Sequence, residues 1–176
     1  MAVSPDRNIY LVGPRASGKT TIGRLLAEAL KRPFLDLDEE FTENTGRTIA
    51  DVVESEGWEA FRDLETAVLA AVAETPGHVV ATGGGVVLKA RNREILSQGV
   101  AVYLQADAEK VVTRLMAELL PEQRPALTGL SLEDEVRKTV REREPYYLAV
   151  AQLIAPDRPI EELAERLTKE LKNWSE

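Results

Sequence analysis

The segment from Gly13 to Thr20 has the residue types and spacing of a phosphate-binding loop. It reads GPRASGKT and matches the pattern G-x-x-x-x-G-K-S/T. Glycine lets the backbone wrap tightly, so that successive N–H groups point at phosphate oxygens, and the helix that follows adds its positive end. In this pattern Lys19 reaches the β- and γ-phosphates of a nucleoside triphosphate, and the Thr20 hydroxyl binds Mg²⁺. The loop predicts these nucleotide-contacting residues: Arg15, Ala16, Ser17, Gly18, Lys19, Thr20 and Thr21.

The surroundings of this loop argue against a chance match. An apolar segment, residues 8–12, precedes it and has the composition of a buried strand, and apolar residues at helical spacing follow it from Ile22 to Leu30. The motif requires a strand before it and a helix after it. A GTPase would also carry N-K-x-D and D-x-x-G motifs, which the sequence lacks. We therefore expect a kinase, and its second substrate needs a pocket of its own.

Two carboxylates, Asp36 and Asp38, follow the second predicted strand. Ligands of open α/β sheets bind at the carboxyl ends of the strands. We expect these two side chains to point to opposite sides of the strand, one serving the metal and the other the acceptor hydroxyl. The alternative is a helix N-cap, a common position for Asp.

Three consecutive glycines, Gly83, Gly84 and Gly85, end the third predicted strand. Glycine allows close approach of the backbone to a ligand and leaves its N–H groups available as donors. An ordinary tight turn is the alternative that the local sequence leaves open.

Two arginines are candidates for binding an anionic acceptor. Arg62 lies on a predicted helix, with Glu65 three residues on, where the carboxylate can brace the guanidinium. Arg143 lies in the segment REREPYY, residues 141–147. Two guanidinium groups suit bidentate capture of a carboxylate, although a single arginine is more often a solvated surface charge.

Arg124 lies in a segment, about residues 116–130, that contains Pro121, Pro125 and Gly129. A loop with one arginine suits a lid that closes over ATP, excludes water and stabilises charge on the transferring phosphoryl group. An ordinary surface loop is the alternative.

The remaining pattern predicts an α/β fold with a parallel sheet covered on both faces, because short, continuously apolar strands alternate with amphipathic helices. The predicted strands are 8–12, 34–35, 78–81, 100–104 and 152–155. The predicted helices are 22–30, a short one around 49–53, a longer one over 58–72, 91–96, 107–117, 132–148 with Pro145 disturbing its end, and 159–171.

Length and composition bound the function. The 176 residues suit one domain, 1–176, and the net charge of −8 argues against a nucleic-acid partner. We expect a cytoplasmic chain without a membrane segment, because the apolar runs are short, no secretion signal is evident and cysteine is absent. We expect a monomer, because no unpaired apolar stripe is evident.

Taken together, these residues resemble the shikimate kinases. The resemblance runs through GPRASGKTTIGRLLAEAL, FLDLDEEF, TGRTIADVVESEGWEAFRDLE, VVATGGGVV, QRPAL and EREPYY. It implies a three-layer α/β/α P-loop NTPase fold, a five-stranded parallel sheet of order 2-3-1-4-5 and a lid loop. It implies Mg²⁺-dependent transfer of the γ-phosphate of ATP to the 3-hydroxyl of shikimate, in aromatic amino acid biosynthesis.

The same resemblance implies roles for single residues. Asp38 would hold the shikimate hydroxyls and act as the base, and Asp36 would serve Mg²⁺ together with Thr20. Arg62 and Arg143 would bind the shikimate carboxylate. The remaining implied roles are backbone contacts to the ring hydroxyls from Gly83, Gly84 and Gly85, the lid arginine for Arg124, and positions near the adenine for Arg114 and Arg158.

The chain departs from this family pattern at two places. Val53 stands where many relatives have an aromatic residue against the shikimate ring, which predicts a looser pocket. The segment between Arg114 and Arg124 is less glycine-rich than in many relatives. Two other functions are weighed against the main one: a related kinase with a different anionic acceptor, and a catalytically silent binding module, whose sequence would be expected to lack Lys19 or Asp38.

Overall fold

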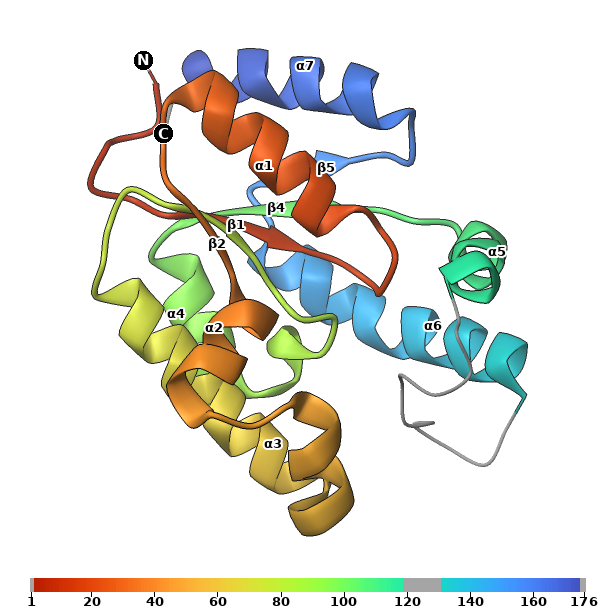
Figure 1. Ribbon diagram of the computed structural model, residues 1–176. Coiled ribbons are helices and arrows are strands. Elements are labelled where there is room, and N and C mark those ends of the chain that lie inside the picture. Colours follow the sequence, from red (N-terminus) through yellow and green to blue (C-terminus); the bar gives the residue numbers. More distant parts are fainter. Residues whose placement is uncertain (1, 119–130, 175–176) are drawn as a thin grey trace.

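The computed structural model describes residues 2–118 and 131–174, and its strands form one parallel sheet (Figure 1). The sheet order is β2-β3-β1-β4-β5, which confirms the order that the family resemblance implied. The strands are β1 (Ile9–Val12), β2 (Phe34–Asp36), β3 (Val79–Ala81), β4 (Val100–Leu104) and β5 (Leu153–Ala155).

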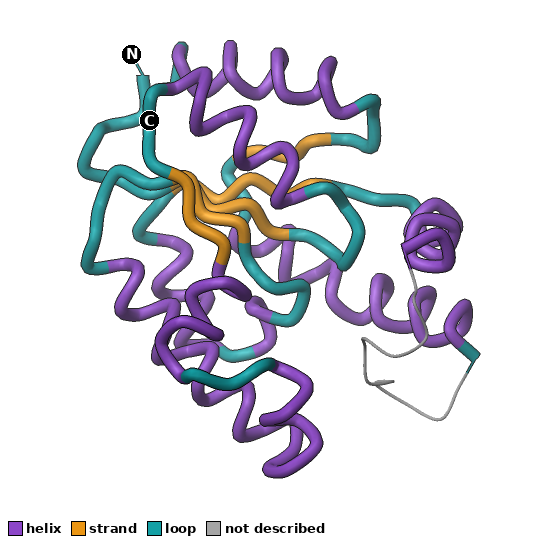
Figure 2. Tube along the Cα trace, viewed as in Figure 1, coloured by secondary structure: helices purple, strands orange, loops and turns teal. Residues whose placement is uncertain are grey.

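Helices cover both faces of this sheet (Figure 2). Helices α1 and α7 lie on one face, and α3, α4 and α6 lie on the other (Figure 1). The helices are α1 (Lys19–Leu30), α2 (Leu37–Thr45), α3 (Ile49–Ala73), α4 (Ala90–Ser97), α5 (Ala108–Glu118), α6 (Leu132–Val150) and α7 (Ile160–Lys172), with a short 3-10 helix η1 (Val86–Leu88).

The alternation of side chains along the strands builds a separate core on each face. In β1, Tyr10 packs into the cluster formed with α3, α4 and α6, whereas Ile9 and Leu11 pack into the cluster formed with α1 and α7. Strand β4 divides in the same way, with Tyr103 on the first side and Val102 on the second. Successive strand residues point to opposite faces, so strands buried on both sides are apolar at every position.

The parallel register brings the carboxyl ends of the strands together. Leu11 of β1 pairs with Ala81 of β3, and Val12 pairs with Tyr103 of β4. Asp36, the last residue of β2, also pairs with Ala81. The segments that follow β1, β2 and β3 therefore leave the sheet at one edge, where the candidate residues lie.

The prediction for the two carboxylates was wrong in its geometry. Only Asp36 belongs to the strand, and Asp38 lies in the first turn of α2. Residues two apart on a strand would in any case point to the same face. The Asp36 side chain caps α2, accepting a hydrogen bond from the Asp38 backbone N–H at 3.0 Å. The helix that this cap begins is absent from the predicted elements.

Two other predictions concern the longer helices. The short and the long helix predicted around 49–53 and 58–72 form one continuous segment, α3, broken at Gly57, whose φ of 86° and ψ of 173° are not helical. Helix α6 continues through Pro145 to Val150, so the proline does not end it. Pro145 and Arg141, whose carbonyl loses its helical partner there, are both exposed, so water can satisfy that carbonyl.

Most of the predicted lid, including Arg124, lies outside the described residues. In the part of the chain that the structure does describe, no helix combines the length and the apolar character needed to cross a bilayer.

Candidate active site at the carboxyl edge of the sheet

A cleft with a volume of about 490 Å³ opens where the segments after β1, β2 and β3 leave the sheet. Every sequence-predicted site residue within the described ranges lines this cleft. These are Arg15, Ala16, Ser17, Gly18, Lys19, Thr20, Thr21, Asp36, Asp38, Arg62, Gly83, Gly84, Gly85, Arg114, Arg143 and Arg158. The structure therefore brings together residues from seven separate stretches of the sequence.

The Lys19 ammonium group is folded back onto its own loop. Its Nζ donates to the carbonyl oxygen of Gly13 at 2.9 Å and to that of Pro14 at 2.6 Å. Burial lowers the pKa of Lys19 to about 8, against the opposing influence of the Asp38 and Asp36 carboxylates. The cleft thus contains a desolvated cation whose hydrogen-bond partners are two carbonyl oxygens and the Ser17 hydroxyl, and an anionic phosphate would be a stronger partner.

The loop around Lys19 takes its shape from unusual backbone angles. Gly18, the N-cap of α1, has a φ of 90°, a left-handed value that favours glycine. Ala16 also has a positive φ, 55°, although it carries a side chain. Its methyl group packs against the cluster formed by α5 and α6, and its carbonyl oxygen accepts a hydrogen bond from Arg114 at 3.1 Å. Contacts from α5 therefore hold this strained residue in place.

A hydroxyl and a carboxylate meet at the start of α1. The Thr20 hydroxyl donates to Asp36 Oδ2 at 2.7 Å, while Oδ1 of the same carboxylate caps α2. Both interpretations of Asp36, as a helix cap and as a site residue, are thus compatible, because each uses a different oxygen. The cap also fixes the first turn of α2, which carries the exposed carboxylate of Asp38.

The Arg62 guanidinium is held by three neighbouring side chains. It donates to Glu65 Oε2 at 2.7 Å, as the spacing of the two residues predicted. Its Cζ lies 4.8 Å from the ring centroid of Phe61 and 5.6 Å from that of Trp58. Burial raises the pKa of Glu65, and the neighbouring Arg62 opposes that shift. The pair leaves Arg62 oriented before any ligand arrives.

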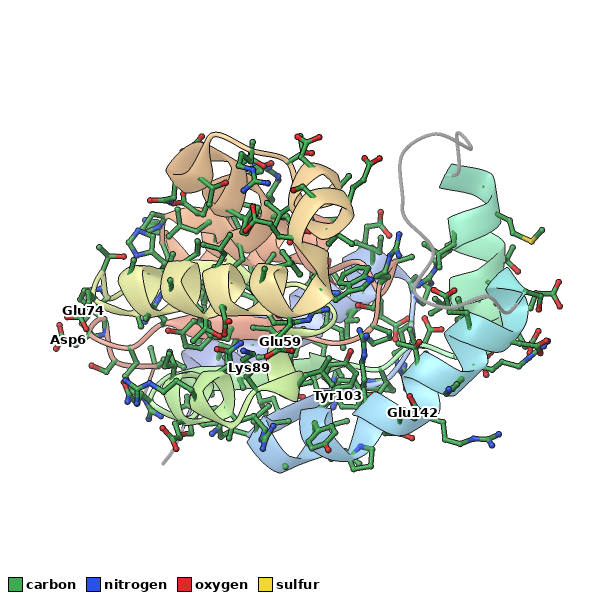
Figure 3. All side chains as sticks on the ribbon, turned by 90° about the horizontal axis from the view of Figure 1, so that it is seen from below. Asp6, Glu59, Glu74, Lys89, Tyr103 and Glu142 are labelled. Atoms are coloured by element: carbon green, nitrogen blue, oxygen red, sulfur yellow. The ribbon has the colours of Figure 1, made fainter. Side chains whose placement is uncertain are left out.

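The three glycines after β3 make room for these charged side chains. A Cβ on Gly85 would lie 2.1 Å from an Arg62 guanidinium nitrogen, and one on Gly83 would lie 2.8 Å from Glu65 Oε1. Downstream of the turn, Lys89 forms ion pairs with Glu59 and Asp63, and Figure 3 shows Lys89 beside Glu59. The turn is therefore anchored to the outer side of α3, the helix that carries Arg62.

Two further arginines lie at the other end of the cleft. Besides bonding to Ala16, Arg114 donates to Asp157 at 3.3 Å, and Arg158 pairs with Glu162 at 2.5 Å. These contacts place Arg114 against the phosphate loop and Arg158 just before α7.

Sequence reasoning missed several residues that line the cleft. Trp58 lines the cleft beside Phe61, as do Ile49 and Ala50 from the first part of α3. Val53 packs against the core cluster beneath them. The helical spacing of these apolar residues indicated a buried face, and nothing in that spacing distinguishes a face toward the core from a face toward a ligand.

The chain is similar in sequence to proteins of one known family. The family model described as shikimate kinase matches residues 15–172. The chain is 46% identical over 147 residues to shikimate kinase 2 of Escherichia fergusonii, covering 83% of this chain and 81% of that relative. It is 44% identical over 170 residues to shikimate kinase 2 of Syntrophotalea carbinolica, covering 93% and 98%.

A solved structure agrees with these relatives. The shikimate kinase from Acinetobacter baumannii, in complex with shikimate, superposes with a TM-score of 0.85 at 39% identity, covering 93% of this chain and 91% of that one.

Proposed function

The chain belongs to the shikimate kinase family, and from this premise we propose how its residues transfer the γ-phosphate of ATP to the 3-hydroxyl of shikimate. The products are shikimate 3-phosphate and ADP. One observation carries the proposal: the phosphate-binding loop and the group formed by Asp38, Arg62 and Arg143 line one cleft. A phosphate donor and an anionic acceptor can therefore be held side by side.

We propose that Arg62 and Arg143 bind the shikimate carboxylate. Arg62 is oriented by Glu65 and by the rings of Phe61 and Trp58, so it need not be ordered when the ligand binds. Two guanidinium groups offer paired N–H donors that match a carboxylate. The backbone of the glycine turn, residues 83–85, lies at the same wall of the cleft and would contact the ring hydroxyls.

The transfer itself needs position and charge more than covalent chemistry. The bond between the shikimate O3 and the γ-phosphorus forms as the bond from that phosphorus to the β–γ bridging oxygen breaks, and ADP leaves. Asp38 orients the 3-hydroxyl and accepts its proton. Lys19 releases the carbonyl oxygens of Gly13 and Pro14 and binds the phosphate oxygens, where its charge stabilises the transferring group.

Thr20 and Asp36 fit the magnesium ion that this family uses. They present a hydroxyl and a carboxylate in mutual contact at the phosphate loop, and Mg²⁺ prefers such oxygen ligands. An ion held there would neutralise phosphate charge, with water and phosphate oxygens completing its coordination.

The other assignments complete the proposal. Residues 1–176 form one kinase domain, with a lid at about 116–130 that carries Arg124. Arg114 and Arg158 lie at the adenine end of the cleft. The chain acts as a cytoplasmic monomer on two small molecules, without nucleic acid or membrane.

A coupled assay of ADP release tests the proposal. With ATP and Mg²⁺ present, shikimate should support turnover, and gluconate and nucleoside monophosphates should not. If Asp38 is the base, Asp38→Asn should lower kcat by about 10²-fold or more while ATP still binds. Glu43→Gln, an exposed change on the same helix, is the matched control. Near-full activity of Asp38→Asn would remove Asp38 from its role, and no response to shikimate would remove the function.

A further inference from the structure

Tyr147 is a fully buried residue next to the acceptor end of the cleft. Helix α6 places it four residues after Arg143, so both side chains lie on the same face of the helix. Its exposed fraction is 0%, and its hydroxyl donates a hydrogen bond to the carbonyl oxygen of Gly84. Any influence of this hydroxyl on a ligand must therefore pass through its neighbours.

The ring of Tyr147 has little freedom to move. It stacks on Tyr103 of β4, with ring centroids 5.0 Å apart and an interplanar angle of 24°. Figure 3 shows Tyr103 at the side of the sheet that α6 covers. A ring held between a central strand and its covering helix places its hydroxyl at a defined point.

The same hydroxyl is close to Arg143. Burial raises the pKa of Tyr147, and the Arg143 guanidinium opposes that rise. A carbonyl oxygen only accepts and a guanidinium only donates, so the hydroxyl hydrogen points to Gly84 and its lone pairs are left for Arg143. The hydroxyl is thus the link between one side chain and one backbone group of the acceptor pocket.

Gly84 in turn lies against the phosphate-binding loop. A Cβ at this position would lie 3.3 Å from the backbone nitrogen of Arg15 and 3.6 Å from the carbonyl oxygen of Gly13. The backbone of Gly84 is therefore in contact range of the nucleotide half of the cleft. A continuous series of contacts runs from Arg143 through Tyr147 and Gly84 to the loop.

We propose that Tyr147 is a positioning residue, whose hydroxyl sets the place of Arg143 relative to the glycine turn and so aligns shikimate with the phosphate-binding loop. This rests on the proposed function, because it takes Arg143 to hold the acceptor carboxylate. The competing explanation is that the hydrogen bond only satisfies a buried hydroxyl. That explanation expects a loss of stability without a selective change in shikimate binding.

Tyr147→Phe tests the two explanations, with Tyr103→Phe as the matched control from the same ring stack. Loss of one hydrogen bond to a charged side chain should raise the KM for shikimate by about tenfold and lower kcat, with the KM for ATP within about twofold of the parent. Tyr103→Phe should leave both KM values unchanged. A shikimate KM within about twofold of the parent in Tyr147→Phe overturns the proposal.

A double-mutant cycle with Arg143→Lys shows whether Tyr147 acts through Arg143. If it does, the double variant should lose clearly less than the product of the two single losses. Strict additivity overturns the positioning role. So does a Tyr147→Phe chain that fails to fold at 10 °C while Tyr103→Phe folds, because the hydroxyl would then be a folding determinant. A parent without shikimate-dependent ADP release is a different result, since that would contradict the proposed function itself.

Discussion

The phosphate-binding loop and the acceptor pocket share one cleft but are held in shape by different interactions. The loop is one contiguous segment, and its own backbone supplies the carbonyl oxygens of Gly13 and Pro14 that hold Lys19. The proposed acceptor pocket combines side chains from separate helices with the glycine turn after β3, and its Arg62 is held by another side chain, Glu65. The acceptor end should therefore respond to residues that never touch the ligand, whereas the nucleotide end should respond mainly to changes in the loop itself and in the α5 contacts to Ala16.

The largest effect should come from removing the buried cation of the loop. Lys19→Met should lower kcat roughly 10²- to 10³-fold, because a donor to the developing phosphate charge is lost. Unfolding of the variant should not account for this loss of activity. A desolvated ammonium group destabilises the folded chain, so its removal should leave the Tm unchanged or raised. Turnover and thermal melting of Lys19→Met and of the exposed control Lys172→Met check this. A large fall in Tm would contradict it.

The next effect concerns the acceptor end. Arg62→Ala should raise the KM for shikimate by about 10- to 100-fold, because charge-assisted hydrogen bonds to the carboxylate are lost. Glu65→Gln keeps the shape of the bracing side chain and removes its charge, so it should raise the same KM by a smaller factor. Steady-state kinetics with each substrate varied in turn would show the effect. If the KM for ATP changed by the same factor, the proposed difference between the nucleotide end and the acceptor end of the cleft would be contradicted.

The affinity for ATP should fall as the pH rises above about 8. Burial lowers the pKa of the unliganded Lys19 to about 8, and bound phosphates favour its charged form. Below that pH the group is already protonated, so binding takes up no proton there. Above it, binding requires proton uptake, and the Kd should rise by at most about tenfold per pH unit. Calorimetry in buffers of different ionisation enthalpy measures the uptake, and a flat Kd from pH 7 to 9.5 would contradict the prediction.

The same lowered pKa makes a prediction about folding. The unfolded chain holds the Lys19 proton up to its ordinary pKa of 10.5, whereas the folded chain releases it at about 8. The unfolded state therefore binds more protons between these values, and this group's contribution to stability improves as the pH rises through that window.

The smallest effect should come from the backbone of α3. Gly57 has φ 86° and ψ 173°, a region that only glycine occupies readily, and a Cβ there would meet nothing within 4 Å. Gly57→Ala should therefore cost about 1–3 kcal/mol from backbone strain alone. Gly46→Ala is a matched control with equal open space, but its φ of 67° and ψ of 14° are left-handed helical values that cost a side chain roughly 1–2 kcal/mol.

Thermal melting of the two glycine variants checks this order, and each kcal/mol should lower the Tm by about 2–4 °C in a chain of this size. Because Gly57 joins the two parts of α3 that line the acceptor pocket, its variant should also raise the KM for shikimate and leave that for ATP unchanged. Equal Tm losses in both variants would contradict the assignment of strain.

The contrast between the two ends also explains what could be predicted from the sequence. The phosphate-binding loop is one contiguous segment, so residues 8–30 alone were enough to predict the loop, the strand before it and the helix after it. The strands were found because burial on both faces makes them apolar throughout. The two parts of α3 were separated correctly at Gly57, where the backbone leaves the helical region.

The predictions were wrong or incomplete where the same local sequence pattern is compatible with more than one structure. Helix α2 was missed because only Leu37 and Phe41 are buried in it, too few for a clear apolar stripe. Asp38 was therefore placed on a strand that ends at Asp36. Trp58 and Tyr147 are aromatic residues, and only the folded arrangement shows that one lines the cleft and the other bonds to Gly84.

The strained backbone at Ala16 has a consequence for the helices beyond it. Its methyl group packs against the α5–α6 cluster, and its carbonyl oxygen accepts a hydrogen bond from Arg114 of α5. The directions of the loop's backbone N–H groups therefore depend on how α5 and α6 pack against the loop. Such coupling is reciprocal. If the packing of α5 against the loop raises the affinity for a nucleoside triphosphate, then bound triphosphate stabilises that packing by the same free energy. Filling the cleft with nucleotide should then slow amide exchange along α5, the helix that carries Arg114.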